Sequence, residues 1–307
     1  MRMTEETTKK TDAKRLKPMK AAVFIVILLA ATAAASAVMA IRVWKNARSG
    51  GLFSWNRSVM YSSGIDKLLD TMERYGLTEL YQNVPSDCDT AIIEELIVKC
   101  SDKGIRVYLL AGDPDWALEQ EGSSLIRVIN RAADWNRAMP EGLRIAGVMS
   151  DIEPHILKDQ DSARLMECFA DGYAAAMAEA GKQELELIAC IPYYFDDEER
   201  RAGLERLVKD GCTGLAVMNY YRGSESEHIL TEAELAKKYD RRIITIYELQ
   251  EEGKYGLTDR NTYNSVGLNA LCDNYGKLRR DYFPQRIDYA LHSYEALLEM
   301  TERESRE

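Results

Sequence analysis

The sequence lacks the short motifs that mark several common classes of protein. Its six cysteines include no C-x-x-C pair, so no metal-ligand spacing is visible, and most lie in apolar or helix-like stretches typical of scattered buried thiols. No glycine-rich phosphate loop follows the first predicted strand, which argues against a dinucleotide-binding fold. A composition of 46% apolar and 29% charged residues argues against long disorder. We expect no cofactor and no metal site.

Acidic residues outnumber basic residues outside the first 20 positions. The chain has 40 Lys and Arg against 50 Asp and Glu, a formal net charge of -10. Residues 1–20 hold seven basic and three acidic residues, a net charge of +4, so the rest of the chain carries -14. An acidic body repels phosphate backbones, and we therefore expect no nucleic-acid partner.

Charge is absent from residues 21–41, AAVFIVILLAATAAASAVMAI. This length matches the roughly 20 apolar residues that a helix needs to cross a bilayer. The basic residues before it predict a cytoplasmic tail at 1–20, a transmembrane signal anchor at 21–41 and a tether at 42–50. We therefore predict a single-pass protein of the cell membrane with its main domain outside the cytoplasm. Cleavage after the small residues near position 40 is the alternative, and it would give a secreted protein.

Residues 51–307 repeat one pattern eight times, a short apolar run followed by an amphipathic helix. Buried strands that alternate with helices over about 250 residues are typical of a closed parallel barrel. The sequence therefore predicts an α/β protein with a single (β/α)8 (TIM) barrel after the anchor. The predicted strands are 51–55, 79–84, 105–111, 144–152, 185–191, 214–220, 242–247 and 287–292. The predicted helices are 62–75, 89–103, 123–138, 162–180, 197–209, 231–239, 263–281 and 294–307.

Barrel active sites are built at the carboxyl ends of the strands, so the residues that end each run are the candidates for chemistry. They combine carboxylates and amides, which bond sugar hydroxyls, with aromatic rings, which stack on sugar rings. We expect Asp151, Glu153 and Glu248 to be catalytic. The expected substrate-binding residues are Trp55, Tyr81, Asn83, Asp113, Trp116, Tyr193, Asn219, Tyr220, Arg222, His292 and Tyr294.

Two carboxyl groups that flank a bond are what glycosidic cleavage requires. Asp151 and Glu153 are two residues apart, so they share a face if the strand continues, and one of them should keep a proton at neutral pH. Structural roles are the alternative for each candidate. Asp151 and Glu153 could cap a helix, Glu248 could be a solvated loop residue, and the aromatic residues could be rim packing.

Residues 147–154 (GVMSDIEP) resemble glycoside hydrolase family 18, the chitinase-like barrels, whose fourth strand ends in Asp-x-Asp-x-Glu. Asp151 and Glu153 match the last Asp-x-Glu of that motif, whereas Ala146 and Met149 replace two earlier aspartates. The resemblance implies that Glu153 is the acid and that Asp151 assists it, while the acetamido group of the substrate attacks.

The sixth run carries a second point of resemblance to the same family. Met218-Asn219-Tyr220 is similar to its Met-x-Tyr segment, although Tyr221 stands where an aspartate is usual. The carboxylate placement also resembles the clan A glycoside hydrolases, which have an acid/base glutamate at strand 4 and a nucleophilic glutamate at strand 7. That resemblance implies Glu153 as acid/base and Glu248 as nucleophile, with Ile152 in the place of the usual asparagine.

These observations predict a membrane-anchored, extracytoplasmic glycoside hydrolase-like protein that acts on a glycan, with Glu153 as the general acid. A non-catalytic glycan-binding barrel and a barrel that serves envelope assembly are the alternatives, because barrels of this kind host many activities. The polar loop at 249–262 is predicted to cover part of the site.

Overall fold

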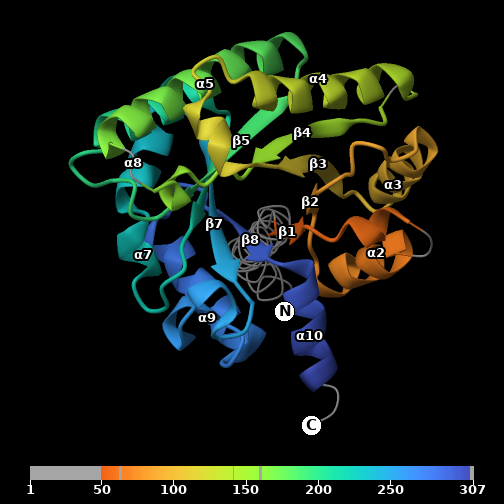
Figure 1. Ribbon diagram of the computed structural model, residues 1–307. Helices are drawn as coiled ribbons and strands as arrows, with labels where there is room; N and C mark the ends of the chain where they lie inside the picture. The colour runs from red at the N-terminus through yellow and green to blue at the C-terminus, as the bar shows by residue number, and fades with distance from the viewer. Residues whose placement is uncertain (1–49, 62–63, 141, 159–160, 305–307) are drawn as a thin grey trace, which may run out of the picture. The chain divides into compact units, whose positions relative to one another are not determined.

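The computed structural model describes residues 50–61, 64–140, 142–158 and 161–304. Eight parallel strands close into a barrel in the order β1 to β8 (Figure 1), so the predicted (β/α)8 architecture is confirmed. The predicted tail, anchor and most of the tether lie outside the described residues. Within the described ranges, no helix is long and apolar enough to cross a membrane. The strands are β1 Gly50–Ser54, β2 Glu79–Gln82, β3 Arg106–Ala111, β4 Ile145–Ser150, β5 Glu186–Pro192, β6 Gly214–Met218, β7 Arg242–Glu248 and β8 Asp288–His292.

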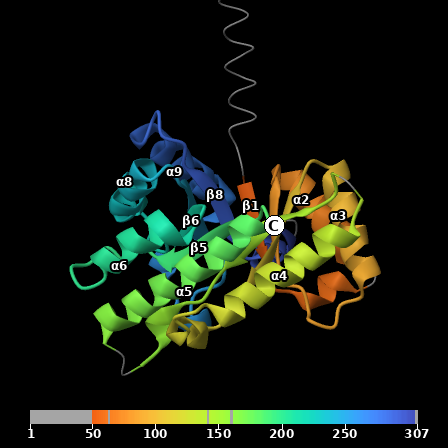
Figure 2. The ribbon, with the colours of Figure 1, turned by 90° about the horizontal axis from the view of Figure 1, so that it is seen from above.

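Helices surround the barrel, and α4 and α5 lie side by side on its outside in both views (Figure 2). Most predicted bounds agree within a few residues. The helix expected at 197–209 starts late, because Asp197 bonds the backbone N–H of Arg200 and forms a turn instead. The helices are α2 Gly64–Tyr75, α3 Thr90–Asp102, α4 Ser123–Ala138, α5 Ser162–Lys182, α6 Arg201–Arg206, α7 Glu225–His228, α8 Leu230–Lys238, α9 Gly267–Asp281 and α10 Tyr294–Glu304. Shorter turns of helix are η1 Arg57–Met60, η2 Pro114–Leu118, η3 Pro154–Ile156, η4 Leu207–Gly211, η5 Lys254–Gly256 and η6 Asp259–Asn261.

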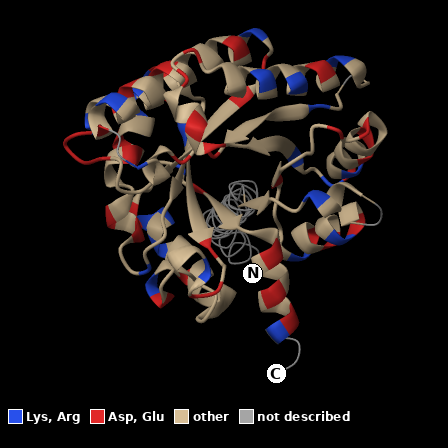
Figure 3. Ribbon diagram, viewed as in Figure 1, with Lys and Arg blue, Asp and Glu red and all other residues tan. Residues whose placement is uncertain are grey.

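Two apolar cores hold the barrel together. The larger core lies between strands and helices, and the smaller one fills the barrel interior with residues such as Phe53, Met149 and Ile246. Side chains alternate between these cores along each strand, as the two-residue period of a strand requires. Charged residues lie mainly on the helices and loops, and the strands are mostly free of them (Figure 3).

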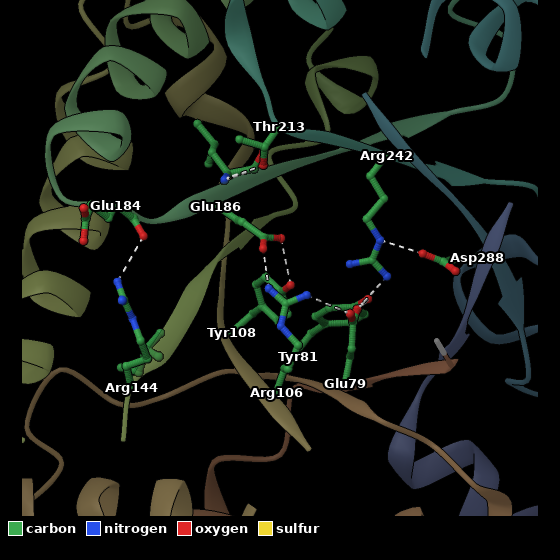
Figure 4. Close-up of polar contacts among 12 residues, drawn as sticks. Glu79, Tyr81, Arg106, Tyr108, Arg144, Glu184, Glu186, Thr213, Arg242 and Asp288 are labelled. Atoms are coloured by element: carbon green, nitrogen blue, oxygen red, sulfur yellow. Dashed lines mark hydrogen bonds and ion pairs between the residues drawn. The ribbon is translucent and has the colours of Figure 1, made fainter. Parts of the chain in front are cut away.

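The amino-terminal end of the barrel interior is an exception, because it is closed by a layer of ion pairs (Figure 4). Arg242 of β7 bonds Glu79 of β2 at 2.9 Å and Asp288 of β8 at 2.7 Å. Arg106 of β3 pairs with Glu79 and with Glu186 of β5. This layer serves stability, since the active sites of such barrels lie at the opposite end.

Tyr81 belongs to this amino-terminal layer and not to a ligand site. Its side chain is fully buried, and its hydroxyl donates to Glu79 at 2.7 Å. Its ring also occupies the space above Gly51, where a Cβ would lie 2.4 Å from the ring. The prediction that Tyr81 binds substrate is therefore corrected, because the side chain turns toward the opposite end of the barrel.

Replacing Arg242 with methionine is expected to destabilise the barrel by about 3–5 kcal/mol, because Glu79 and Asp288 would lose the most buried of their cations and keep only the more exposed Arg106 and Arg286. The measurement is urea unfolding followed by circular dichroism. Arg137→Met is the matched control, since Arg137 forms an exposed pair with Asp134 that should contribute less than about 1 kcal/mol. Equal losses in the two variants would contradict the role given to the layer.

Candidate active site

Asp151 and Glu153 follow β4 directly and form the centre of the site. Met149 lies in the inner core and Ile152 in the outer core, so the alternation of side chains directs Asp151 toward the barrel axis. The strand ends at Ser150 and Glu153 has a left-handed backbone, so the expectation that the two residues share a strand face is corrected. The negative charge of Glu153 raises the pKa of Asp151. The positive charge of His292, from β8, lowers the pKa of both carboxyl groups. The two groups are close enough for this interaction although the strand does not continue to Glu153, and their catalytic roles remain predictions.

The backbone around this pair is closely constrained. The N–H of Asp151 donates to the carbonyl oxygen of Ala111 at 2.9 Å, and a Cβ at Gly112 would lie 1.7 Å from the carbonyl oxygen of Asp151. Only glycine permits this approach of β3 to β4. Glu153 adopts a left-handed conformation with φ 54°, and the buried Pro154 follows it. Such strain in a non-glycine residue costs on the order of 1 kcal/mol and is concentrated at functional sites.

Burial keeps this pair partly protonated near neutral pH. Burial, together with the negative charge of Glu153, raises the pKa of Asp151 to about 7 from 3.8. Its Oδ1 atom is buried and has no hydrogen-bond partner among the described residues. Burial also raises the pKa of Glu153, while the positive charge of His292 lowers it. The pair is therefore suited to hold a single proton, as an acid catalyst requires.

Glu248 ends β7 beside His292 of β8, and the two residues are paired in the sheet register. Its Oε2 atom lies 2.9 Å from Nδ1 of His292. Its Oε1 atom accepts from the backbone N–H groups of Leu249 and Gln250, at 2.9 and 2.8 Å. Both carboxylate oxygens are thus occupied by donors, and Glu248 is only 3% exposed.

Tyr220 and Trp55 complete the centre of the site. Both pack on the inner core at the carboxyl-terminal ends of β6 and β1. Burial raises the pKa of the Tyr220 hydroxyl, and the charges of Glu248, Asp151 and Glu153 raise it further, so the hydroxyl stays protonated among all three carboxyl groups. The ring of Tyr220 lies 6.3 Å from that of His292. Tyr220 therefore supplies a neutral donor at the position of the Met-x-Tyr resemblance.

Four further predicted residues mainly hold loops at this end of the barrel. Asn83 accepts from Arg57 and donates to the carbonyl oxygen of Leu110. Asp113 is exposed and caps η2. Asn219 is buried and donates to the carbonyl oxygen of Glu225 and to Thr245, and Arg222 binds Asp259. Their predicted contact with a ligand remains a prediction.

Three predicted aromatic residues pack away from the centre. Tyr193 stacks on His228 with ring centroids 4.1 Å apart. Trp116 packs against the outer core beside Ile152. Tyr294 is 3% exposed, belongs to the outer core and hydrogen-bonds with Thr71 of α2. The expectation that Tyr294 binds substrate is corrected, because the start of α10 directs this ring between the helices.

Sequence reasoning left two residues of the site out of the predicted set. His155 in η3 has Nε2 3.7 Å from Oε1 of Glu153, and burial and the charge of Arg200 lower its pKa to about 4. Gln250 has its side-chain nitrogen 3.3 Å from Nδ1 of His292. The sequence could have indicated His155, because it is the second residue after Glu153. It could not have indicated Gln250, because hydrophobic periodicity does not predict the path of the loop that contains this residue.

The loop at 249–262 lies at the carboxyl-terminal end of the barrel, where the sequence predicted it. Asn261 donates to the carbonyl oxygen of Tyr220, and Arg260 donates to the hydroxyl of Tyr221. These contacts fasten the loop to the segment after β6. The loop thereby holds the backbone that carries Tyr220.

The sequence matches no protein-family model and no curated protein at a significant level. Among solved structures, it is similar to a GH18 chitinase from Pseudoalteromonas aurantia, with a TM-score of 0.51 and 9% identity over 83% of this chain and 99% of that chain. It is also similar to a chitinase from Bacteroides thetaiotaomicron, with a TM-score of 0.53 and 8% identity over 81% of this chain and 90% of that one. The chain has the barrel fold of these two chitinases. At such identities the likeness concerns the fold.

Proposed function

We propose that the protein is a glycoside hydrolase that acts on a glycan, with Glu153 as general acid and Asp151 as its partner. The observation that carries this proposal is the Asp151–Glu153 pair, which can share one proton near neutral pH at the end of a barrel strand. The two chitinases of the same fold support the choice of a carbohydrate as substrate.

The two carboxyl groups differ in access, which supports different roles for them. The side chain of Glu153 is 36% exposed, so it can reach the oxygen of a leaving group. In Asp151, by contrast, Oδ1 is buried and has no hydrogen-bond partner among the described residues, and the carboxyl group lies near Cys190 of the inner core. In this proposal Glu153 donates the proton, and Asp151 becomes the ionised partner that stabilises positive charge developing on the substrate.

The bonding of Glu248 favours the resemblance to family 18 over the resemblance to clan A. A nucleophilic carboxylate needs an oxygen free to attack carbon. Both oxygens of Glu248 already accept hydrogen bonds from His292, Leu249 and Gln250. We therefore assign the attack to a group of the substrate, as in the substrate-assisted mechanism, and a supporting role to Glu248.

A glycan-binding barrel without turnover is the second candidate, and Met149 favours it. Met149 stands where the resembled motif has an aspartate, and its sulfur lies 3.3 Å from that of Cys190. A barrel that serves envelope assembly, with no glycan chemistry, is the third possibility.

The cellular location proposed for the protein is supported by the sequence before the barrel. We propose that residues 21–41 anchor the protein in the cell membrane with residues 1–20 in the cytoplasm and the barrel outside. Cleavage of this segment would release a secreted barrel with the same site.

The test is to measure hydrolysis and binding by the full-length chain on a panel of aryl glycosides and polysaccharides that includes chitin oligosaccharides. Turnover of one glycan class supports the hydrolase. Tight binding without turnover would favour the binding barrel, and neither binding nor turnover would favour the envelope scaffold.

A further inference from the structure

The pair formed by Glu248 and His292 is built to hold a positive charge inside the site. Oε1 of Glu248 accepts hydrogen bonds from two backbone N–H groups, which hold this carboxyl group in place beside His292. Its remaining contact is with Nδ1 of His292 at 2.9 Å. A proton on Nδ1 can be donated to Oε2 of Glu248, and the side-chain nitrogen of Gln250, 3.3 Å from the same Nδ1, then forms no hydrogen bond with it. A second proton, which the surrounding carboxyl groups favour, makes Nε2 a donor as well.

The ring of His292 is held in place by its neighbours. Phe53 contacts it edge to face, with ring centroids 5.6 Å apart, and Tyr220 lies 6.3 Å away. No described residue forms a hydrogen bond with Nε2 of His292, and 16% of the side chain is exposed. A bound glycan can therefore reach this nitrogen, on the side of the ring away from Glu248.

We propose that His292 is a fixed imidazolium of the site, held protonated by Glu248, and that it presents Nε2–H to an oxygen of the bound sugar. Its charge also favours the ionised form of the Asp151–Glu153 pair. Glu248 is then a positioning residue that acts through His292 and does not attack the substrate. The contact with sugar rests on the proposed hydrolase function, whereas the protonation of His292 does not.

The charges around His292 support this role. Burial lowers the pKa of His292, but the hydrogen bond with Glu248 and the negative charges of Glu248, Asp151 and Glu153 outweigh it and raise the pKa above 6.5. In return, the positive charge of His292 lowers the pKa of both Asp151 and Glu153. Three carboxyl groups thus surround one imidazole, and the Tyr220 hydroxyl beside them is neutral.

The histidine content of the chain makes a direct test possible. There are three histidines, and the other two have lowered pKa values, to about 4 for His155. We would label the full-length chain with ¹⁵N-histidine and titrate it by NMR. The expected result is one imidazolium at pH 7, assigned to His292 by its loss in His292→Gln.

The Glu248→Gln variant is expected to lower the pKa of His292 and to leave the other two histidines unchanged. Glu252→Gln, a change at an exposed loop position, is the matched control. Should Glu248→Gln fold poorly, Asp151→Asn gives an independent reading, because removing that negative charge also lowers the pKa of His292. A neutral His292 at pH 7 in the wild-type chain, or a pKa that is the same in all variants, would overturn the inference.

Activity separates this role from that of a nucleophile. Glu248→Gln is expected to lose activity at neutral pH and to recover it as the pH is lowered through the new pKa of His292. Azide is expected to give no rescue of Glu248→Ala. Rescue by azide with formation of a glycosyl azide would contradict the inference, because it would identify Glu248 as the attacking group. Absence of turnover in the wild-type chain would count against the hydrolase, and the NMR titration would still decide the state of His292.

Discussion

Glu153→Gln is expected to lower kcat/KM for glycan hydrolysis by about 10²–10⁴-fold, the range that a positioned general acid contributes. Glutamine has nearly the shape of glutamate, but it cannot donate a proton to the leaving oxygen. The side chain is partly exposed and forms no buried ion network, so the fold should be unchanged. Initial rates on the substrate found in the panel, with melting temperatures alongside, measure the effect.

The control for this prediction is Glu94→Gln, an exposed glutamate of α3 remote from the site. It should leave both rate and melting temperature unchanged. A Glu153→Gln variant that keeps more than half of the wild-type rate would remove Glu153 from the mechanism. An aryl glycoside with a good leaving group should lose less rate than a natural glycan, because it needs less protonation.

Asp151→Asn is expected to lower the rate by about 10²-fold, because the ionised partner of the acid is lost. The same change should stabilise the fold above neutral pH. Burial raises the pKa of Asp151 to about 7, so ionising it costs the folded state free energy. The stability that the neutral form contributes is present below the unfolded pKa of about 4 and is lost as the pH rises through about 7.

The effect of Asp151→Asn on stability is measured by thermal unfolding at pH 4 and pH 8. Wild type and Asp151→Asn should be similar at pH 4, whereas the variant should be more stable by on the order of 2 kcal/mol at pH 8. A loss of activity joined to a gain of stability is the signature of a group retained for chemistry. A variant that is less stable at pH 8 would instead indicate a structural role for Asp151.

The barrel could be predicted from the sequence because each unit carries its own signal. Continuous apolar runs indicated buried parallel strands, and each predicted strand overlaps an observed one. The nearness of Asp151 and Glu153 was also predictable, because the two residues are neighbours in the chain, but the left-handed backbone at Glu153, which breaks the strand period, was not. Local patterns are sufficient where the interacting residues are close in sequence.

The remaining site residues depend on geometry that a single strand does not contain. Tyr81 and Tyr294 were predicted from their places near strand ends, but the direction of each side chain turned them elsewhere. The state of Glu248 depends on the two N–H groups that the following loop turns back toward it. The close approach of Gly112 to Asp151 depends on how β3 and β4 pack, and local sequence patterns do not predict the packing of two strands.

The pH profile of kcat/KM for the wild-type chain tests the central claim most directly. A site that works by retaining one proton on the Asp151–Glu153 pair should lose activity as that proton leaves, so the alkaline limb should have an apparent pKa near 7. In Asp151→Asn the residual activity should show this limb at lower pH, since Glu153 then titrates without its neighbour. A wild-type profile that stays flat to pH 9, or a limb that does not move in the variant, would contradict the account.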